Sequence, residues 1–558
     1  MSVDPARGLR AAEEARATEQ PAFITVLTDE QVTAFAGLAD DGPLAGIPFA
    51  VKDNIDVRGV ASTAACPTLT APAERSSYVV ERLLGAGAIP VAKTNMDQFA
   101  TGLVGTRSPF GACHSIYSTD HISGGSSSGS AVAVALGVVP LALGTDTAGS
   151  GRVPAAFNGL VGMKPTRGLV STRGLLPACP SLDCITTLTR TVADAEAALR
   201  VMIGFDPLDP YSRPLPPAPP PGVASRMRVI AVPSAPLDLE PAHEAAWQQA
   251  IQHAEAIARV VEVDVEPFLK AARLLYEAPF VSERTAAFGE LLEPDGPHLD
   301  PTVASIVRRG ADYSAPEAFV AFHELMRLQR LTSAVFVSAD ALLLPVTPWH
   351  PTLAAVASDP VGANSRNGVF TNMTNLLDMC AIAVPAGMRA DGLPFGVQLL
   401  APAFADVPLM RLAAAWVGEG AGASWSVPEG RSLVAVAGAH LSGQPANPEL
   451  LRLGGHLHAR ARTAGGYRMY SVAGPFPRPG LVRSGEGPAD GIEIEVWDLP
   501  TTSLVALAAS IAPPLSLGLI DLDDDTTVTG FVAEPSAANG ATDITHFGGW
   551  RRYVASQV

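Results

Sequence analysis

Hydrophobic and polar positions alternate along the first four hundred residues in two recurring patterns. Short apolar runs that end at polar turns predict strands, and they lie at 46–53, 88–94 and 138–146. Apolar residues at helical spacing, with polar residues on the other face, predict helices at 76–87, 128–137 and 191–204. Strands that alternate with helices favour an α/β domain, and we expect a mixed central sheet covered by helices.

A different pattern follows a Gly- and Ser-rich stretch at 417–432. Beyond it, β-like runs with turn residues between them lie at 466–474, 491–499 and 517–534. We therefore expect a first domain over 1–425, a linker over 426–432 and a smaller, β-rich α+β domain over 433–558. The proline-rich segment 214–222 predicts a surface loop.

Composition narrows the function classes. The chain has 558 residues, a formal net charge of −17 and 17% charged residues. No cluster of Lys and Arg marks a nucleic-acid footprint, and no uncharged apolar run is long enough to span a bilayer. We expect no nucleic-acid or membrane partner and a cytoplasmic protein. Reduced thiols are expected for the five cysteines, which are Cys66, Cys113, Cys179, Cys184 and Cys380.

The stretch SGGSSSGS at 123–130 raises three possibilities: a flexible linker, a phosphate-binding loop or part of an active site. An apolar run follows it directly, which disfavours a linker, and it lacks the lysine of a phosphate loop. A glycine-rich turn that enters a buried helix remains. If the following strand runs back beside that helix, a second Ser-Gly turn, which carries Ser150, lies beside the first.

A serine nucleophile needs a base and a stabilised oxyanion. The backbone amides of Thr147, Ala148, Gly149 and Ser150 could stabilise the oxyanion. No histidine lies in an obvious catalytic motif, but Lys52 follows an apolar strand, and burial would lower its pKa towards the range of a base. Judged alone, such a lysine is more often a surface or structural residue, and a serine such as Ser150 more often shapes a turn.

Segment 124–168 resembles the signature of the amidase signature family, and 50–56 and 93–111 resemble two further blocks of that family, in order. The resemblance extends over about residues 20–420. It implies an amidohydrolase without metal or organic cofactor, in which Ser150 is the nucleophile, Ser126 bridges the proton from within a cis peptide, and Lys52 is the base. Asp146 and Arg152 beside the nucleophile are expected to form a structural ion pair.

Segments 274–284 and 364–385, and the tail beyond 433, resemble those of allophanate hydrolases. This resemblance implies allophanate as the substrate, with its carboxylate held by Tyr276 and Arg284 and with Gly102 near it. Straight helix would place Tyr276 and Arg284 about 12 Å apart. Pro279 between them can break the helix and bring the two side chains together.

The tail resembles a γ-glutamylcyclotransferase-like domain, which some relatives use in decarboxylation, and His440 is the candidate residue there. A structural histidine is an equal alternative, and the domain could instead serve assembly. We expect a homodimer, and a separate protein, either a urea carboxylase or another upstream pathway enzyme, as a partner. Two other functions remain open: a broad or malonamidase-like amidase with a structural tail, and a scaffold or amidotransferase subunit.

Overall fold

The chain divides into two compact units, Met1–Glu419 and Gly420–Val558. The computed structural model describes residues 3–39, 42–216, 227–291, 298–419, 431–442, 444–472, 478–523 and 526–557. Most of the predicted proline-rich loop and of the predicted linker lies outside these ranges.

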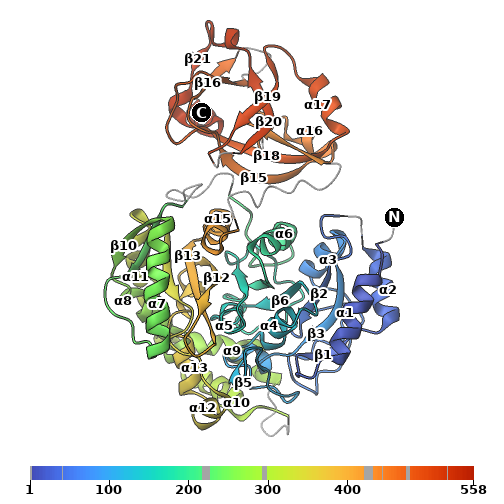
Figure 1. Ribbon diagram of the computed structural model, residues 1–558, viewed down its shortest axis with the longest axis vertical. Helices are drawn as coiled ribbons and strands as arrows, with labels where there is room; N and C mark the ends of the chain where they lie inside the picture. Colours follow the sequence, from blue (N-terminus) through green and yellow to red (C-terminus); the bar gives the residue numbers. More distant parts are fainter. Residues whose placement is uncertain are drawn as a thin grey trace. The chain divides into compact units, whose positions relative to one another are not determined.

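An eleven-stranded mixed sheet forms the centre of the first unit (Figure 1). The parallel pairs are β2 with β3 and β6, and β9 with β10 and β11, and the other neighbours are antiparallel. In spatial order the strands are β1 (Phe23–Val26), β3 (Ile89–Thr94), β2 (Pro48–Lys52), β6 (Leu141–Thr145), β8 (Ile185–Thr189), β7 (Val161–Lys164), β12 (Met379–Met388), β13 (Pro394–Pro402), β11 (Ala341–Pro345), β9 (Val229–Pro233) and β10 (Arg259–Val263).

The strands predicted from apolar runs are confirmed in β2, β3 and β6, and every residue of these three strands is buried. Strands that are covered on both faces lose the alternation of polar and apolar residues, which explains their continuous apolar character. Strands β2 and β6 are parallel neighbours, so their carboxyl ends lie side by side and the chain segments that follow them meet there. The candidate site lies at these carboxyl ends.

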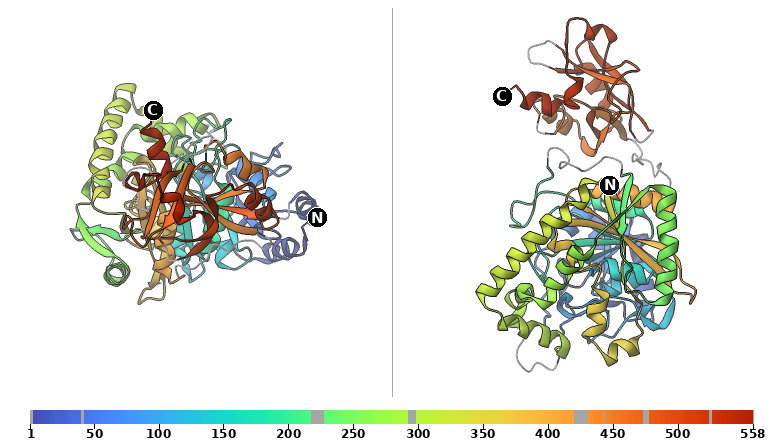
Figure 2. Two further views of the ribbon diagram at one scale, coloured as in Figure 1. Left: turned by 90° about the horizontal axis from the view of Figure 1, so that it is seen from above. Right: turned by 90° about the vertical axis from the view of Figure 1, so that its left-hand side faces the viewer.

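Helices cover the sheet in two layers (Figures 1 and 2). At one edge of the sheet, α1 and α2 lie beside β1 and β3, and at the other edge, α7, α8 and α11 lie beside β9 and β10. Within the described ranges, none of the helices combines the length and apolarity that a membrane span requires. The helices are α1 (Ala6–Ala17), α2 (Asp29–Leu38), α3 (Tyr78–Gly85), α4 (Ser128–Ala135), α5 (Arg152–Phe157), α6 (Val192–Met202), α7 (Pro241–Ile257), α8 (Glu266–Glu277), α9 (Ser282–Phe288), α10 (Pro301–Arg309), α11 (Ala315–Ser333), α12 (Leu353–Ser358), α13 (Gly362–Asn367), α14 (Met373–Leu376) and α15 (Asp406–Val417).

The second unit is β-rich and has its own apolar core. A five-stranded sheet has the order β15 (His456–Arg462), β18 (Glu493–Pro500), β14 (Arg431–Val436), β20 (Thr527–Ala533) and β19 (Leu515–Asp521). A smaller sheet contains β17 (Arg478–Arg483), β16 (Tyr467–Val472) and β21 (Thr542–Asp543), and the helices are α16 (Asn447–Arg452), α17 (Ser503–Ser510) and α18 (Trp550–Ala555). The predicted fold class, an α/β unit followed by a smaller β-rich α+β unit, is confirmed.

The two Ser-Gly turns meet as predicted. Helix α4 begins at Ser128, directly after the first turn, and β6 returns beside it to end at Thr145. The backbone N–H of Ser127 donates to the carbonyl of Ser150 across the two turns, with a distance of 3.2 Å. Residues 123–130 are therefore buried structure and not a linker.

Candidate active site

Lys52 ends β2 and is completely buried. Its Nζ donates to Ser126 Oγ and to Thr145 Oγ1, both at 2.7 Å. The ion pairs of the described residues include none with Lys52, so burial is not offset by a carboxylate in contact. Burial lowers the pKa of Lys52 to about 7, although the more distant carboxylates of Asp97, Asp183 and Asp146 act in the opposite direction.

Ser126 and Ser150 come from the two adjoining turns and are also buried. The Gly125–Ser126 peptide bond is cis, as the family resemblance implies. The Ser150 hydroxyl donates to the carbonyl of Gly102 over a long 3.4 Å, so Gly102 lies at the nucleophile. The structure thus brings Lys52, Ser126, Ser150 and Gly102 to one place.

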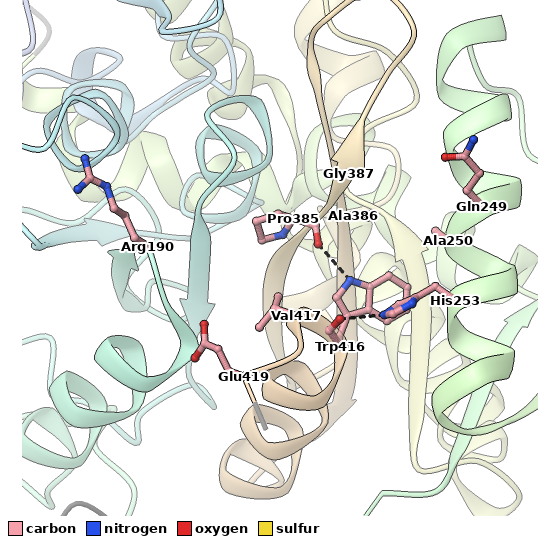
Figure 3. Close-up of a pocket in the computed structure, with 10 residues that line it drawn as sticks. All are labelled: Arg190, Gln249, Ala250, His253, Pro385, Ala386, Gly387, Trp416, Val417 and Glu419. Carbon is pink, nitrogen blue, oxygen red and sulfur yellow. Dashed lines mark hydrogen bonds between the residues drawn. The ribbon is translucent and has the colours of Figure 1, made fainter. Parts of the chain in front are cut away.

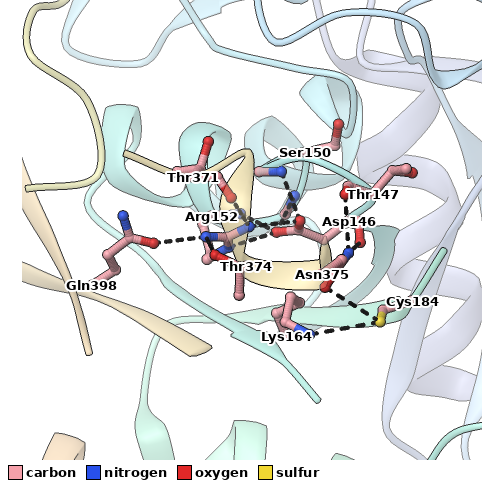
Figure 4. A network of polar contacts seen from close by, with 12 residues as sticks. Asp146, Thr147, Ser150, Arg152, Lys164, Cys184, Thr371, Thr374, Asn375 and Gln398 are labelled. Carbon is pink, nitrogen blue, oxygen red and sulfur yellow. Dashed lines mark hydrogen bonds and ion pairs between the residues drawn. The ribbon is translucent and has the colours of Figure 1, made fainter. Parts of the chain in front are cut away.

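Asp146 and Arg152 form a bidentate, fully buried ion pair (Figure 4). Two guanidinium nitrogens lie 2.9 Å from the two carboxylate oxygens, and the third donates to Thr374 and Gln398. Burial alone would raise the pKa of the Asp146 carboxyl, but Arg152 holds this pKa below its usual value. Every contact of the pair is internal, which supports the architectural role expected from sequence.

The turn over residues 147–150 carries the amides expected to stabilise an oxyanion. The N–H of Gly149 donates to Asp146 Oδ1 at 2.7 Å, so this amide is directed to the carboxylate and not to a substrate. Among the described residues, the N–H groups of Thr147, Ala148 and Ser150 form no hydrogen bond. Three of the four expected amides therefore remain available.

Tyr276 and Arg284 meet although eight positions separate them. Helix α8 ends at Glu277, a 3₁₀ turn that starts at Pro279 follows, and α9 carries Arg284. Arg284 Nη2 donates to the Tyr276 hydroxyl at 3.0 Å and Nη1 donates to Thr101 Oγ1 at 3.1 Å. The predicted break of the helix near Pro279 is confirmed, and Arg284 is buried.

Three buried polar residues of the site were not identified from the sequence. Asp97 accepts from the backbone N–H groups of 104, 105 and 107 and so shapes the loop beyond Gly102. Asp183 accepts from the Thr147 hydroxyl and from the N–H groups of 178 and 179, and burial raises its pKa to about 6. Asn375 donates to the carbonyls of Asp146 and Thr147. The sequence around them mixes polar and apolar residues and does not single them out.

The site contains hydroxyl, amine, amide and guanidinium groups, together with the carboxylates of Asp97 and Asp183. In the part of the chain that the structure describes, no group of three or more His, Cys, Asp and Glu could hold a metal ion. All five cysteines are buried and unpaired. In the second unit, His440 Nε2 and Glu449 Oε2 are 2.8 Å apart, and the imidazole lies against the Phe531 ring.

A hollow of about 570 Å³ lies elsewhere in the first unit (Figure 3). Three of its polar residues already have protein partners: Glu419 accepts from the N–H groups of 192 and 193, His253 bonds to the Trp416 carbonyl, and the Trp416 indole donates to the Pro385 carbonyl. Because these groups serve the fold, we place the candidate active site at Lys52 and not in this hollow.

Comparisons with known proteins agree with this geometry. The amidase family model matches residues 12–410, and the model of the allophanate hydrolase C-terminal domain matches residues 432–555. The chain is 36% identical to a single-residue variant of the Kluyveromyces lactis allophanate hydrolase, with a TM-score of 0.73, over 100% of this chain and 97% of that chain.

Two further relatives are similar to the chain over different shares of its length. The urea amidolyase of Saccharomyces cerevisiae is 41% identical over 541 residues, which are 92% of this chain and 30% of that protein. The chain thus spans less than a third of the length of this relative. One component of the glutamyl-tRNA(Gln) amidotransferase of Symbiobacterium thermophilum is 34% identical over 71% of this chain and 88% of that protein. The chain belongs to the amidase family, as an amidohydrolase that carries an allophanate hydrolase C-terminal domain.

Proposed function

We propose that the chain hydrolyses allophanate through an acyl-enzyme on Ser150. The observation that carries the proposal is the buried contact of 2.7 Å between Lys52 and Ser126 beside Ser150, with no carboxylate ion-paired to the lysine among the described residues. An uncharged lysine amine can accept a proton, and burial places the pKa of Lys52 at about 7, within the working range of a general base.

In the proposed first step, Ser150 Oγ attacks the carbamoyl carbon of allophanate. Its proton passes through Ser126 Oγ to Lys52 Nζ, and the amides of 147, 148 and 150 stabilise the oxyanion. The protonated lysine returns the proton through Ser126 to the leaving nitrogen, and ammonia departs. Water then attacks the acyl-enzyme with Lys52 again as the base, and N-carboxycarbamate leaves.

Recognition of allophanate is assigned to Arg284 and Tyr276. A planar carboxylate suits the fork of a guanidinium, and the adjacent Tyr276 hydroxyl adds a donor. The resemblance of both units to an allophanate hydrolase supports this substrate over a simple aliphatic amide. It also favours this reading over a component of an amidotransferase, because the similarity to that relative covers 71% of this chain.

A second activity is proposed for the second unit. N-carboxycarbamate loses carbon dioxide and takes up one proton to give carbamate, which in turn yields ammonia and carbon dioxide. His440, paired with Glu449 at 2.8 Å, is a suitable donor of that proton. A separate protein that forms allophanate would supply the substrate. We also propose that the chain forms a homodimer, as expected from the sequence.

Ammonia release from allophanate by the full chain tests the main proposal, with the product identified by ¹³C NMR. We expect turnover of allophanate to exceed that of malonamate and of aliphatic amides, and Ser150→Ala to lower it more than about 10³-fold. Faster turnover of aliphatic amides than of allophanate would favour the broad amidase. Undiminished turnover in Ser150→Ala would exclude the nucleophile.

A further inference from the structure

Helix α9 holds the segment 99–102 at two points. Arg284 Nη1 donates to Thr101 Oγ1 at 3.1 Å, and the Phe288 ring stacks on Phe99 with ring centroids 4.8 Å apart. The other end of this segment, the carbonyl of Gly102, accepts from Ser150 Oγ. One short stretch of backbone therefore joins the arginine proposed for carboxylate binding to the proposed nucleophile.

The backbone of this stretch has an unusual conformation. Phe99 and Ala100 have φ values of 50° and 51°, in the left-handed region that residues other than glycine rarely adopt. The Thr101 hydroxyl donates to the carbonyl of Phe99 at 3.1 Å, and Arg107 donates to the carbonyl of Thr101 at 2.9 Å. Residues in such sparsely populated backbone conformations cluster at active sites and binding sites. The conformation of Phe99 and Ala100 therefore points to a functional role for this turn.

The contact at the end of the stretch is easily exchanged. A distance of 3.4 Å is long for a hydroxyl donor, so the bond from Ser150 to Gly102 is weak. While Ser150 donates its proton to Gly102, it cannot donate the same proton to Ser126. A hydroxyl released from Gly102 is free to donate elsewhere, and the proposed reaction requires it to donate to Ser126.

We propose that Thr101 is a positioning residue that couples carboxylate binding at Arg284 to the alignment of Ser150. This inference rests on the proposed function. A carboxylate that binds the guanidinium changes its bond to the Thr101 hydroxyl, and the change is passed through one peptide unit to the carbonyl of Gly102. Ser150 then donates to Ser126, so amides that lack a carboxylate react slowly because the nucleophile is misaligned.

The test supplies the substrate in two pieces, formamide as the amide and acetate as the carboxylate. We expect saturating acetate to raise kcat for ammonia release from formamide by about tenfold in the wild type, a typical coupling between two sites. Thr101→Val removes both hydrogen bonds of the hydroxyl at nearly equal volume, and we expect it to abolish the activation. Thr101→Ser retains the hydroxyl and should restore it.

Two controls separate coupling from damage. Thr332 is a buried threonine on α11 whose hydroxyl also donates to a backbone carbonyl, and Thr332→Val should leave the activation by acetate unchanged. Acetate should still inhibit malonamate hydrolysis by Thr101→Val competitively, because Arg284 is intact. Circular dichroism and the thermal midpoint of each variant establish that it is folded.

Equal activation by acetate in the wild type and in Thr101→Val would overturn the inference, as would acetate that inhibits malonamate hydrolysis but does not activate formamide hydrolysis. Should Thr101→Val not fold, Thr101→Ala and Thr101→Ser provide the same contrast. Failure of the proposed function has a different signature: the wild type would not release ammonia from allophanate, or Ser150→Ala would retain the activity.

Discussion

Lys52 and Lys93 lie on the neighbouring parallel strands β2 and β3, both with fully buried side chains. Lys93 pairs in register with Val51 and not with Lys52, so the two lysines project from opposite faces of the sheet. On one face, Lys52 Nζ donates to the hydroxyl groups of Ser126 and Thr145. On the other face Lys93 Nζ lies 3.6 Å from Asp53 Oδ1 and donates to Ser62 Oγ.

The difference separates the proposed base from a lysine of the fold. Burial lowers the pKa of both amines, but at Lys93 a carboxylate within ion-pair distance opposes the effect. Among the described residues Lys52 has no carboxylate at that distance, and the serine that it contacts is the proposed proton relay. The sequence contains four lysines, and Lys52, Lys93 and Lys164 are buried while Lys270 is exposed.

The largest effect is expected at Lys52. Lys52→Met removes the proposed base at similar volume and should lower kcat for allophanate by about 10³-fold, because proton transfer then depends on water. Ammonia release under saturating substrate measures it, and Lys52→Arg is the matched control, since a guanidinium is too basic to accept the proton. Activity in either variant close to that of the wild type would remove Lys52 from the mechanism.

At Lys93 the main effect should be on stability. Lys93→Met leaves the Asp53 carboxylate buried without its cation, and we expect the free energy of unfolding to fall by about 3–5 kcal/mol, measured by urea denaturation. Adding Asp53→Asn should recover part of the loss. The kcat of the folded fraction should change little, and a loss of kcat comparable with that of Lys52→Met would abolish the distinction between the two lysines.

The pH dependence should follow Lys52. The base must be neutral, and its pKa is about 7, so kcat/KM should fall tenfold per pH unit below that value and reach a plateau above it. Asp183→Asn removes a negative charge that favours the protonated lysine, and it should move the acid limb to lower pH. A flat profile between about pH 5.5 and 8.5, or an unchanged limb in Asp183→Asn, would contradict this assignment.

The smallest effect on ammonia release is expected in the second unit. His440→Ala should leave the first release of ammonia from allophanate unchanged and slow the appearance of carbon dioxide, with Glu449→Gln acting in the same direction. Stopped-flow detection of carbon dioxide beside an ammonia assay separates the two steps. Unchanged carbon dioxide kinetics in both variants would leave His440 as a structural residue.

Much of the fold could be predicted from the sequence, since the apolar runs at 46–53, 88–94 and 138–146 predict the strands that the structure shows as β2, β3 and β6. The adjacency of the two Ser-Gly turns also followed, because a helix and a returning strand of similar length end together. Such local arguments do not determine strand order. The eleven-stranded arrangement depends on pairings between distant segments such as β7 with β12.

The site was only partly predictable for a related reason. The sequence context makes Lys52 and Ser150 candidates, and the resemblance to the amidase signature family implies the roles of Lys52, Ser126 and Ser150. The destination of a backbone N–H does not follow from residue type, and Gly149 donates to Asp146. Asp97 and Asp183 escaped detection because a buried carboxylate is recognised by the amides that surround it. Those amides lie only 4 to 10 positions away, but residue type does not show that the loop turns their N–H groups towards the carboxylate.

The central claim, that burial lowers the pKa of Lys52 to about 7, can be measured directly because the chain has so few lysines. With [ε-¹³C]lysine incorporated, NMR should give one signal for each of the four lysines of the sequence, and Lys52→Arg assigns one of them. We expect the Lys52 signal to titrate with a midpoint near 7. A Lys52 signal that keeps the chemical shift of a charged amine up to about pH 9 would show that the lysine is not the neutral base proposed here.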